Sequence, residues 1–337
     1  MNRRKFVVIS TVAMLAITMA VVGLSFYSSF AARAFGQGLP VAVHYFPADS
    51  QAVFGMNVQA FINSPVYAQF VQQHEQEIGK DLADIVAKTG VDPQKDVDYV
   101  VGAARPNQQK GAGVVIAIGR FVPATIITFI NSQFINSQAT AIRVDYKGAT
   151  VLMVPEANGS KLEKGVAFLS DAEIAVGDLD SLHAVIDVRA GAPGIDSNSA
   201  LSALLAKLSP QEMFWFAGDP SSVISKVPAT APSIPAISSI QSIYGSLNVN
   251  AAVTGKVVVI AKDQTAAGQL ADFVRGLIAL GNLAGGQNQN LADLMKSLQV
   301  TQSANELDLS LTLPLDLIQK LQSPQGKIGM HVPLIKK

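Results

Sequence analysis

The chain has 337 residues, of which 49% are hydrophobic and only 15% are charged. This charged fraction lies well below the roughly 25% of typical soluble domains, so it excludes a disordered chain and predicts a weakly charged surface. The 25 basic and 25 acidic side chains balance, so the sequence lacks the positive charge that nucleic-acid binding requires. The absence of cysteine excludes disulfide bonds, thiolate metal sites and cysteine nucleophiles.

Residues 1–34 predict a membrane segment. Three basic residues precede an uncharged and largely apolar run over residues 6–32, which is long enough to cross a bilayer as a helix. The basic residues place the N-terminus inside and the body outside. A signal peptide is the competing interpretation, because Ala32-Arg33-Ala34 offers a small-residue cleavage site before Phe35. We therefore expect either an inner-membrane anchor with the body in the periplasm or another extracytoplasmic space, or a body secreted after cleavage near Phe35.

The exported part is mildly acidic. Without residues 1–34 it carries 21 basic and 25 acidic groups, which gives a net charge of −4. Such a body has little electrostatic attraction to anionic lipid headgroups. Any membrane contact beyond residues 6–32 would therefore be hydrophobic.

A linker at residues 35–47 leads into a first α+β module at residues 48–209. Alternating apolar residues predict a strand over residues 51–58, and helical spacing follows over residues 59–88 with interruptions at Pro65 and Gly79. The remaining predicted elements are strands at 98–105 and 112–121, a helix at 123–131, hairpins at 142–155 and 166–176, and helices from Asp178 or Asp180 to about 189 and at 200–208.

A second module at residues 210–322 repeats this order, and residues 323–337 form a C-terminal tail. Its predicted elements are strands at 212–217 and 256–262, a helix at 266–280, a hairpin at 298–313 and a helix from Pro314. We interpret the repeat as a duplication in which the 142–155 hairpin is an insertion. The predicted fold class is α+β, with two related modules of mostly antiparallel sheet, helices packed on one face, and a preceding N-terminal hydrophobic helix.

Three short motifs lie at residues 47–50 (Pro-Ala-Asp-Ser), 90–93 (Gly-Val-Asp-Pro, with Asp96 and Asp98 after it) and 198–201 (Asn-Ser-Ala-Leu). In these motifs the chain resembles uncharacterised exported bacterial proteins that have an N-terminal hydrophobic segment and duplicated α+β modules. The resemblance covers residues 44–210. It implies the same architecture but no activity, and it transfers no site residue.

Motifs for catalysis and for metal binding are missing from the sequence. Histidine occurs at four positions, His44, His74, His183 and His331. None of these has the second histidine one turn later that a zinc helix needs, and neither a G-x-S-x-G turn nor a phosphate-binding glycine loop is present. Asp92, Asp96 and Asp98 lack the glycine turn and terminal glutamate of a calcium loop, so we interpret them as turn and strand caps. We therefore expect no catalytic residue, no cofactor and no metal.

Residues 227–255 carry no charge. After three prolines, Ile237, Ile240, Ile243 and Tyr244 recur at helical spacing. Burial against the second sheet is the simplest explanation. The alternative is that these four residues form an apolar contact surface for lipid, another apolar ligand or a protein partner.

The sequence thus predicts a membrane-anchored extracytoplasmic protein, not an enzyme, that serves as an envelope interaction or binding module. A carrier or sensor of an apolar ligand such as lipid is the second interpretation, and a hydrolase with an unrecognised site is the third. The expected partners are the membrane, through residues 6–32, and an apolar ligand or a protein. Nucleic acid is not expected.

Overall fold

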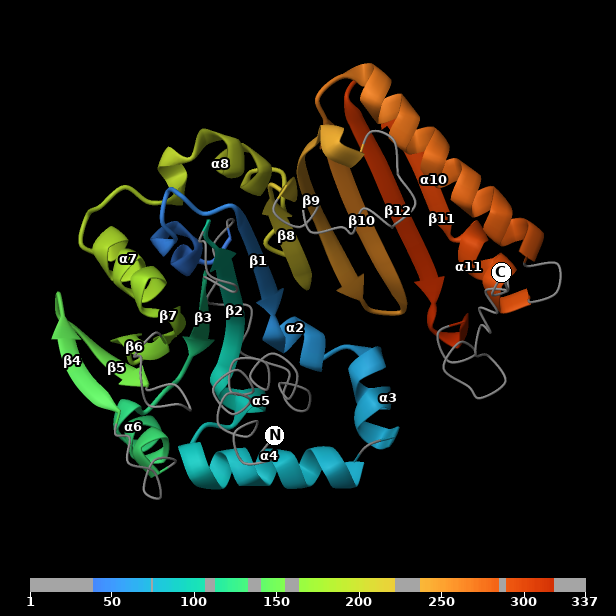
Figure 1. Ribbon diagram of the computed structural model, residues 1–337. Coiled ribbons are helices and arrows are strands. Elements are labelled where there is room, and N and C mark those ends of the chain that lie inside the picture. Colours follow the sequence, from blue (N-terminus) through green and yellow to red (C-terminus); the bar gives the residue numbers. More distant parts are fainter. Residues whose placement is uncertain are drawn as a thin grey trace, which may run out of the picture. The chain divides into compact units, whose positions relative to one another are not determined.

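The computed structural model describes residues 39–73, 75–106, 113–132, 141–154, 164–221, 237–284 and 289–317 (Figure 1). The chain divides into two compact units, Met1–Gly218 and Asp219–Lys337. The expected membrane segment, its cleavage site and the C-terminal tail lie outside the described residues. Among the helices of the described residues, none is long and apolar enough to cross a membrane.

The first unit is built on a large antiparallel sheet. Its strands are β1 (Ala52–Asn57), β2 (Val97–Ala104), β3 (Gly113–Gly119), β4 (Ile142–Tyr146), β5 (Ala149–Val154), β6 (Lys164–Ser170), β7 (Glu173–Asp178) and β8 (Phe214–Gly218). They are hydrogen-bonded in the order β8-β1-β2-β3-β7-β6-β5-β4. The predicted α+β class and the dominance of antiparallel pairing are therefore confirmed.

The helical elements of this unit lie before and between these strands. They are η2 (Val41–Tyr45), α2 (Val58–Ile62), α3 (Pro65–Gln73), α4 (Glu75–Thr89), α5 (Pro93–Asp96), α6 (Pro123–Ser132), α7 (Leu179–Arg189), η3 (Ile195–Ser197) and α8 (Ser199–Leu205). The predicted interruption at Pro65 is present between α2 and α3, whereas Gly79 lies inside α4.

Helices cover both faces of the first sheet, which corrects the prediction of one covered face. Ile174 on β7 packs in a core cluster with Ile126 and Phe129 of α6. The next residue, Ala175, points to the opposite face and is also fully buried, on the side where α7 contacts β3, β6 and β7. The reason is visible in β3, where residues 114–118 form an unbroken apolar run, and such a strand requires cover on both faces.

Strand β8 joins the first unit. Its residues pair antiparallel with β1 from Ala52↔Gly218 to Met56↔Phe214. Trp215 lies so close to Gly55 that a Cβ there would overlap the indole ring, and its Nε1 donates to Tyr99 Oη at 2.6 Å. Because of this pairing β8 belongs to the first unit, which ends at Gly218.

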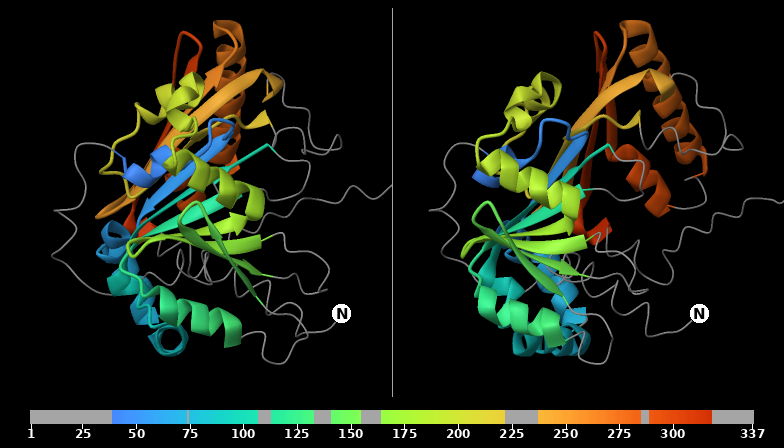
Figure 2. Two further views of the ribbon diagram at one scale, coloured as in Figure 1. Left: turned by 90° about the vertical axis from the view of Figure 1, so that its left-hand side faces the viewer. Right: turned by 60° about the vertical axis from the view of Figure 1, so that its left-hand side comes forward.

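The second unit is a four-stranded antiparallel sheet with a long helix against it. Its elements are η4 (Ile237–Ser239), β9 (Ile240–Val249), β10 (Ala252–Ala261), α10 (Gln264–Ala284), α11 (Gln289–Lys296), β11 (Leu298–Ser303) and β12 (Glu306–Pro314). The strands pair in the order β9-β10-β12-β11. Leu270 of α10 is buried against Val259 and Leu307, and α10 lies along the strands (Figure 2).

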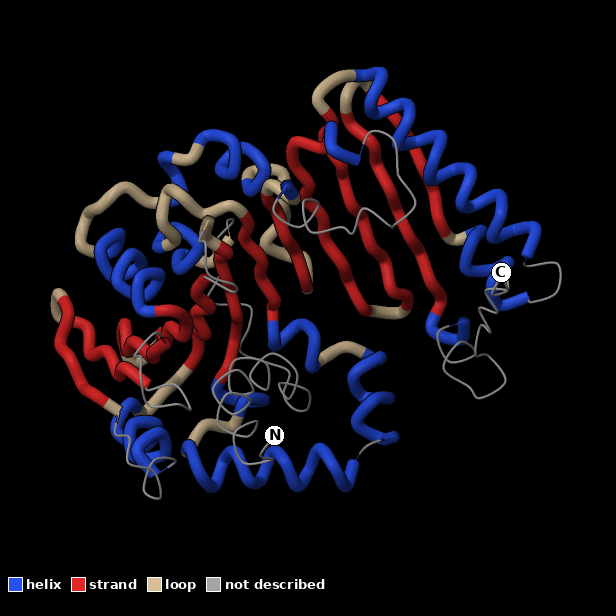
Figure 3. Tube along the Cα trace, viewed as in Figure 1, coloured by secondary structure: helices blue, strands red, loops and turns tan. Residues whose placement is uncertain are grey.

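Part of the first sheet has the same strand order as the second. Strands β2, β3, β7 and β6 are neighbours in that order, as are β9, β10, β12 and β11 (Figure 3 shows the strands in red). In each set a helix follows the second strand, α6 in the first unit and α10 in the second. The β4–β5 hairpin extends the first sheet beyond β6.

Candidate functional site

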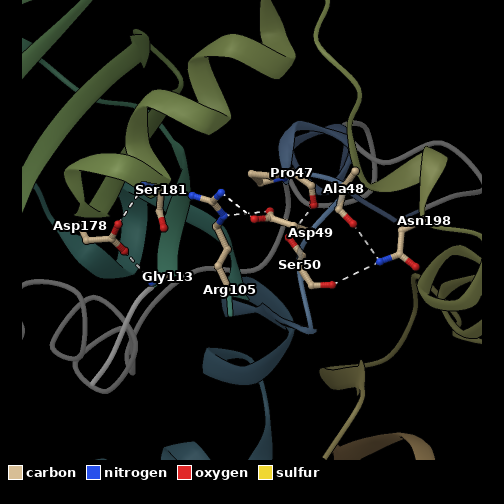
Figure 4. A network of polar contacts seen from close by, with 9 residues as sticks. All are labelled: Pro47, Ala48, Asp49, Ser50, Arg105, Gly113, Asp178, Ser181 and Asn198. Carbon is tan, nitrogen blue, oxygen red and sulfur yellow. Dashed lines mark hydrogen bonds and ion pairs between the residues drawn. The ribbon is translucent and has the colours of Figure 1, made fainter. Parts of the chain in front are cut away.

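A polar network joins the loop before β1 to the end of β2 (Figure 4). Arg105 donates from Nε and Nη2 to the two carboxylate oxygens of Asp49, at 2.9 and 2.7 Å. A guanidinium that meets a carboxylate with two parallel hydrogen bonds forms a directional ion pair. This hydrogen bonding raises the pKa of Arg105 above its usual value, against the opposing effect of partial burial. The ion pair therefore holds the loop before β1 against the end of β2.

Asn198 fastens the same loop from the other side. Its Nδ2 donates to the carbonyl oxygens of Ala48 at 2.9 Å and Ser50 at 3.3 Å, while its Oδ1 accepts from the Leu201 amide at the start of α8. One side chain thus caps a helix and holds a loop about 150 positions away. The structure brings two of the three sequence motifs, those beginning at Pro47 and at Asn198, into direct contact, and their role there is structural.

Asp178 ends β7 and begins α7. Its Oδ1 accepts from the Ser181 amide at 2.9 Å, and its Oδ2 accepts from the Gly113 amide at 2.7 Å. This confirms that Asp178 acts at the N-terminus of the helix, where the backbone amides stabilise it. The Ser181 hydroxyl is fully buried and has no hydrogen-bond partner among the described residues. A serine nucleophile needs a hydrogen-bonded base, and this hydroxyl has none there.

The histidines of the described residues lie apart from this network. His44 Nδ1 lies 2.8 Å from a carboxylate oxygen of Asp196, with both side chains exposed. His183 stacks on the ring of Tyr146, with 4.2 Å between centroids, and Tyr146 Oη donates to Asp187. His74 and His331 lie outside the described residues. These contacts make two separate surface pairs and no shared site.

The three clustered aspartates are placed at a turn and a strand start. Asp92 accepts from the Gln94 amide, and Asp96 accepts from the Asp92 amide at 2.8 Å. Asp98 lies 3.7 Å from Arg120, and burial raises its pKa. Across the part of the chain that the structure describes, no group of three or more histidine, aspartate or glutamate side chains could hold a metal ion.

The four residues predicted as an apolar contact surface do not lie on a helix. Ile237 is in the short η4, and Ile240, Ile243 and Tyr244 are in strand β9. Ile240 and Ile243 are partly buried and pack against the core cluster beneath α10. Tyr244 pairs with Val258 on the opposite face, because Ile243 pairs with Val259. The structure therefore places Ile240 and Ile243 on one face of the sheet and Tyr244 on the other, while Ile237 lies before the strand.

A β-bulge explains why the spacing imitated a helix. The register between β9 and β10 shifts so that Ser242 pairs with Ile260 while Ile240 pairs with Ala261. The extra residue, Gln241, puts Ile240 and Ile243 on one face although they are three positions apart. A spacing of three is typical of a helix, so the sequence pattern was misread.

The second unit exposes an apolar surface that the sequence analysis missed. Leu277, Leu280 and Leu283 lie three positions apart on α10 and are 51%, 64% and 78% exposed. We call these three residues the α10 leucine row. The sequence indicates this surface. Residues 276–284 carry no charge, and their leucines cover more of the helix circumference than the apolar stripe that packs against one sheet.

Comparisons with known proteins give a distant structural likeness. No protein-family model matches the chain, and no curated protein sequence matches it. A solved structure described as "Structure of crystal form I of TP0453" aligns with a TM-score of 0.42 and 10% identity. The alignment covers 84% of this chain and 96% of that chain. At this distance the likeness carries no functional argument.

Proposed function

We propose that this chain is an extracytoplasmic binding module of the cell envelope, held to the membrane through residues 6–32 and without catalytic function. The observation that supports this proposal best is the α10 leucine row. Large apolar side chains that are more than half exposed on successive turns of one helix are costly in water and mark binding surfaces.

The partner that fits the row best is the acyl region of a lipid bilayer. The row is a ridge on a helix, and residues 276–284 add no charge that would oppose insertion into lipid. A body with a net charge of −4 gains little from anionic headgroups, so the contact would rest on hydrophobic burial. An anchor at residues 6–32 would keep the second unit within reach of the same membrane.

A single-cysteine label tests this proposal in the full chain, which contains no cysteine. Leu280→Cys is labelled with an environment-sensitive fluorophore and reconstituted in phosphatidylcholine vesicles that contain a lipid-attached quencher. We expect a blue-shifted emission that the quencher reduces and that added salt leaves unchanged. The matched control is Val122→Cys before α6, also highly exposed, whose label should remain in water. Equal emission and equal quenching at the two positions would contradict lipid contact by α10 and leave a protein partner as the alternative.

We also infer that the two units arose by duplication. The shared order of β2-β3-β7-β6 and β9-β10-β12-β11 supports this, as does a helix after the second strand of each set. The β4–β5 hairpin, for which the second unit has no counterpart among its described strands, would be the insertion. An experimental structure in which residues 97–178 and 240–314 superpose with α6 and α10 on matching faces would support the duplication, and helices on opposite faces would refute it.

A further inference from the structure

Strand β4 lies at one end of the sheet order in the first unit (Figure 1). Within the described residues its pairing partner is β5 alone. Its first four residues are all exposed, and Ile142 and Val144 are 47% and 37% exposed. An exposed edge strand presents unpaired backbone N–H and C=O groups to any strand that can align with it.

The turn after β4 determines which backbone groups point outward. Lys147 and Gly148 form a two-residue turn with φ values of 47° and 86°. Tyr146 and Ala149 flank this turn, and in such a hairpin the flanking residues exchange backbone hydrogen bonds. The pattern alternates, so Arg143 and Asp145 direct their N–H and C=O groups away from β5.

The sequence of β4 is complementary to itself when it is read antiparallel. With Val144 opposite Val144 of a second copy, Arg143 of each copy lies opposite Asp145 of the other. Both charged side chains lie on one face and are exposed. On the other face Val144 meets its own counterpart, and Ile142 meets Tyr146. Opposite charges and apolar pairs at directly facing positions stabilise an antiparallel pair.

Among the registers centred on Arg143, Val144 and Asp145, only the one centred on Val144 places opposite charges together. If the strands shift so that the centre lies at Arg143, two arginines face each other. If the centre lies at Asp145, two aspartates face each other and Lys147 faces Arg143. Like charges at directly facing positions are destabilising. In all three of these registers the residues whose backbone groups point outward pair with each other. The charges favour the register centred on Val144.

We propose that β4 pairs antiparallel with β4 of a second copy of this chain, about a two-fold axis at Val144. The contact is isologous, since each copy contributes the same strand. A five-residue edge buries much less surface than the roughly 1,600 Å² of a standard interface, so the pairing is weak between freely diffusing molecules. Two copies anchored in one membrane would meet at a far higher effective concentration. The pairing does not depend on lipid contact by α10.

Disulfide cross-linking of the full chain in phosphatidylcholine vesicles tests the axis directly. Directly facing residues of a pair without backbone hydrogen bonds have Cα atoms about 4.5 Å apart, within the range of a disulfide. Val144→Cys should therefore form a covalent dimer under mild oxidation. Val122→Cys, an exposed valine before α6, is the matched control and should cross-link at least several-fold more slowly. Equal cross-linking rates for the two variants would overturn the proposal.

A charge exchange tests the register. In the Val144→Cys background, Arg143→Asp places two carboxylates opposite each other and should reduce dimer formation several-fold. Adding Asp145→Arg restores opposite charges across the axis and should restore the cross-linking. Thermal melting of each variant shows whether the first unit is folded. Rescue by the double exchange supports β4 pairing, whereas a folded double variant that cross-links no better than Arg143→Asp would contradict it.

Discussion

Single side chains in the first unit connect segments that are distant in the sequence. Asn198 joins α8 to the loop before β1, and Asp178 joins α7 to the start of β3. The cap of α7 was predictable, because an acid before an apolar helical pattern is a local signal. The second partner of each side chain was not predictable, since nothing local in the sequence indicates which distant amide or carbonyl lies nearby.

The buried pair of Tyr99 and Trp215 predicts an alkaline limit to stability. Burial raises the pKa of Tyr99 from 10.0 to about 12, although the hydrogen bond from Trp215 opposes this shift. A raised pKa in the folded state means that the protonated phenol stabilises the fold below pH 10 and that this stability is lost as the pH rises towards 12. The free energy of unfolding should fall by about 2 to 3 kcal/mol across this range through Tyr99 alone.

Urea unfolding at several pH values measures this loss. Tyr99→Phe removes the ionisable group. The decline of the unfolding free energy between pH 10 and pH 12 should therefore be shallower by about the slope that one titrating proton contributes. It also leaves Trp215 Nε1 without its acceptor, so stability at neutral pH should drop by about 1 to 3 kcal/mol. An unchanged alkaline slope in Tyr99→Phe would show that the pKa of Tyr99 is not raised in the folded state.

At the scale of elements, most hairpins and helices were predictable and one segment was not. The turn at Lys147 and Gly148 and the helix after Pro123 carry strong local signals, and both are present. The segment after residue 237 was predicted as a helix because its isoleucines recur every three residues. A bulge in β9 produces the same spacing in a strand, and pairing with β10 determines the outcome.

Ile240→Asp tests the assignment of β9 to the core. Ile240 packs against the cluster beneath α10, so a carboxylate there loses apolar contact and is placed against this apolar cluster. We expect a loss of about 2 kcal/mol or more in the free energy of unfolding and a clear drop in melting temperature. Gln241→Asp, at the exposed neighbouring position, is the control and should shift stability by no more than about 0.5 kcal/mol. A melting curve of Ile240→Asp that coincides with wild type would instead favour an exposed contact surface.

At the scale of the whole molecule, the sequence predicted the α+β fold class, and its module boundaries stay predictions. The antiparallel α+β architecture follows from hairpin signals along the chain. Strand β8 pairs with β1, and helices cover both faces of the first sheet because β3 carries apolar residues on both faces. Pairing across more than 150 residues is a property of the folded chain, so no local pattern could reveal it.

The orientation of the chain across the membrane gives the last prediction. Three basic residues precede the apolar run at residues 6–32, so the body should lie outside the cytoplasm. A reporter enzyme that is active only outside the cytoplasm, fused after Lys337, should therefore be active, and a reporter that requires the cytoplasm should not. N-terminal sequencing of the exported protein then separates the two forms, since Met1 indicates an anchor and a start near Phe35 indicates cleavage.

Reversing the charge pattern, by changing Arg3, Arg4 and Lys5 to acidic residues, should reduce export. If the body resists external protease in cells with a permeabilised outer envelope, the orientation is wrong and the membrane-facing role proposed for α10 loses its basis.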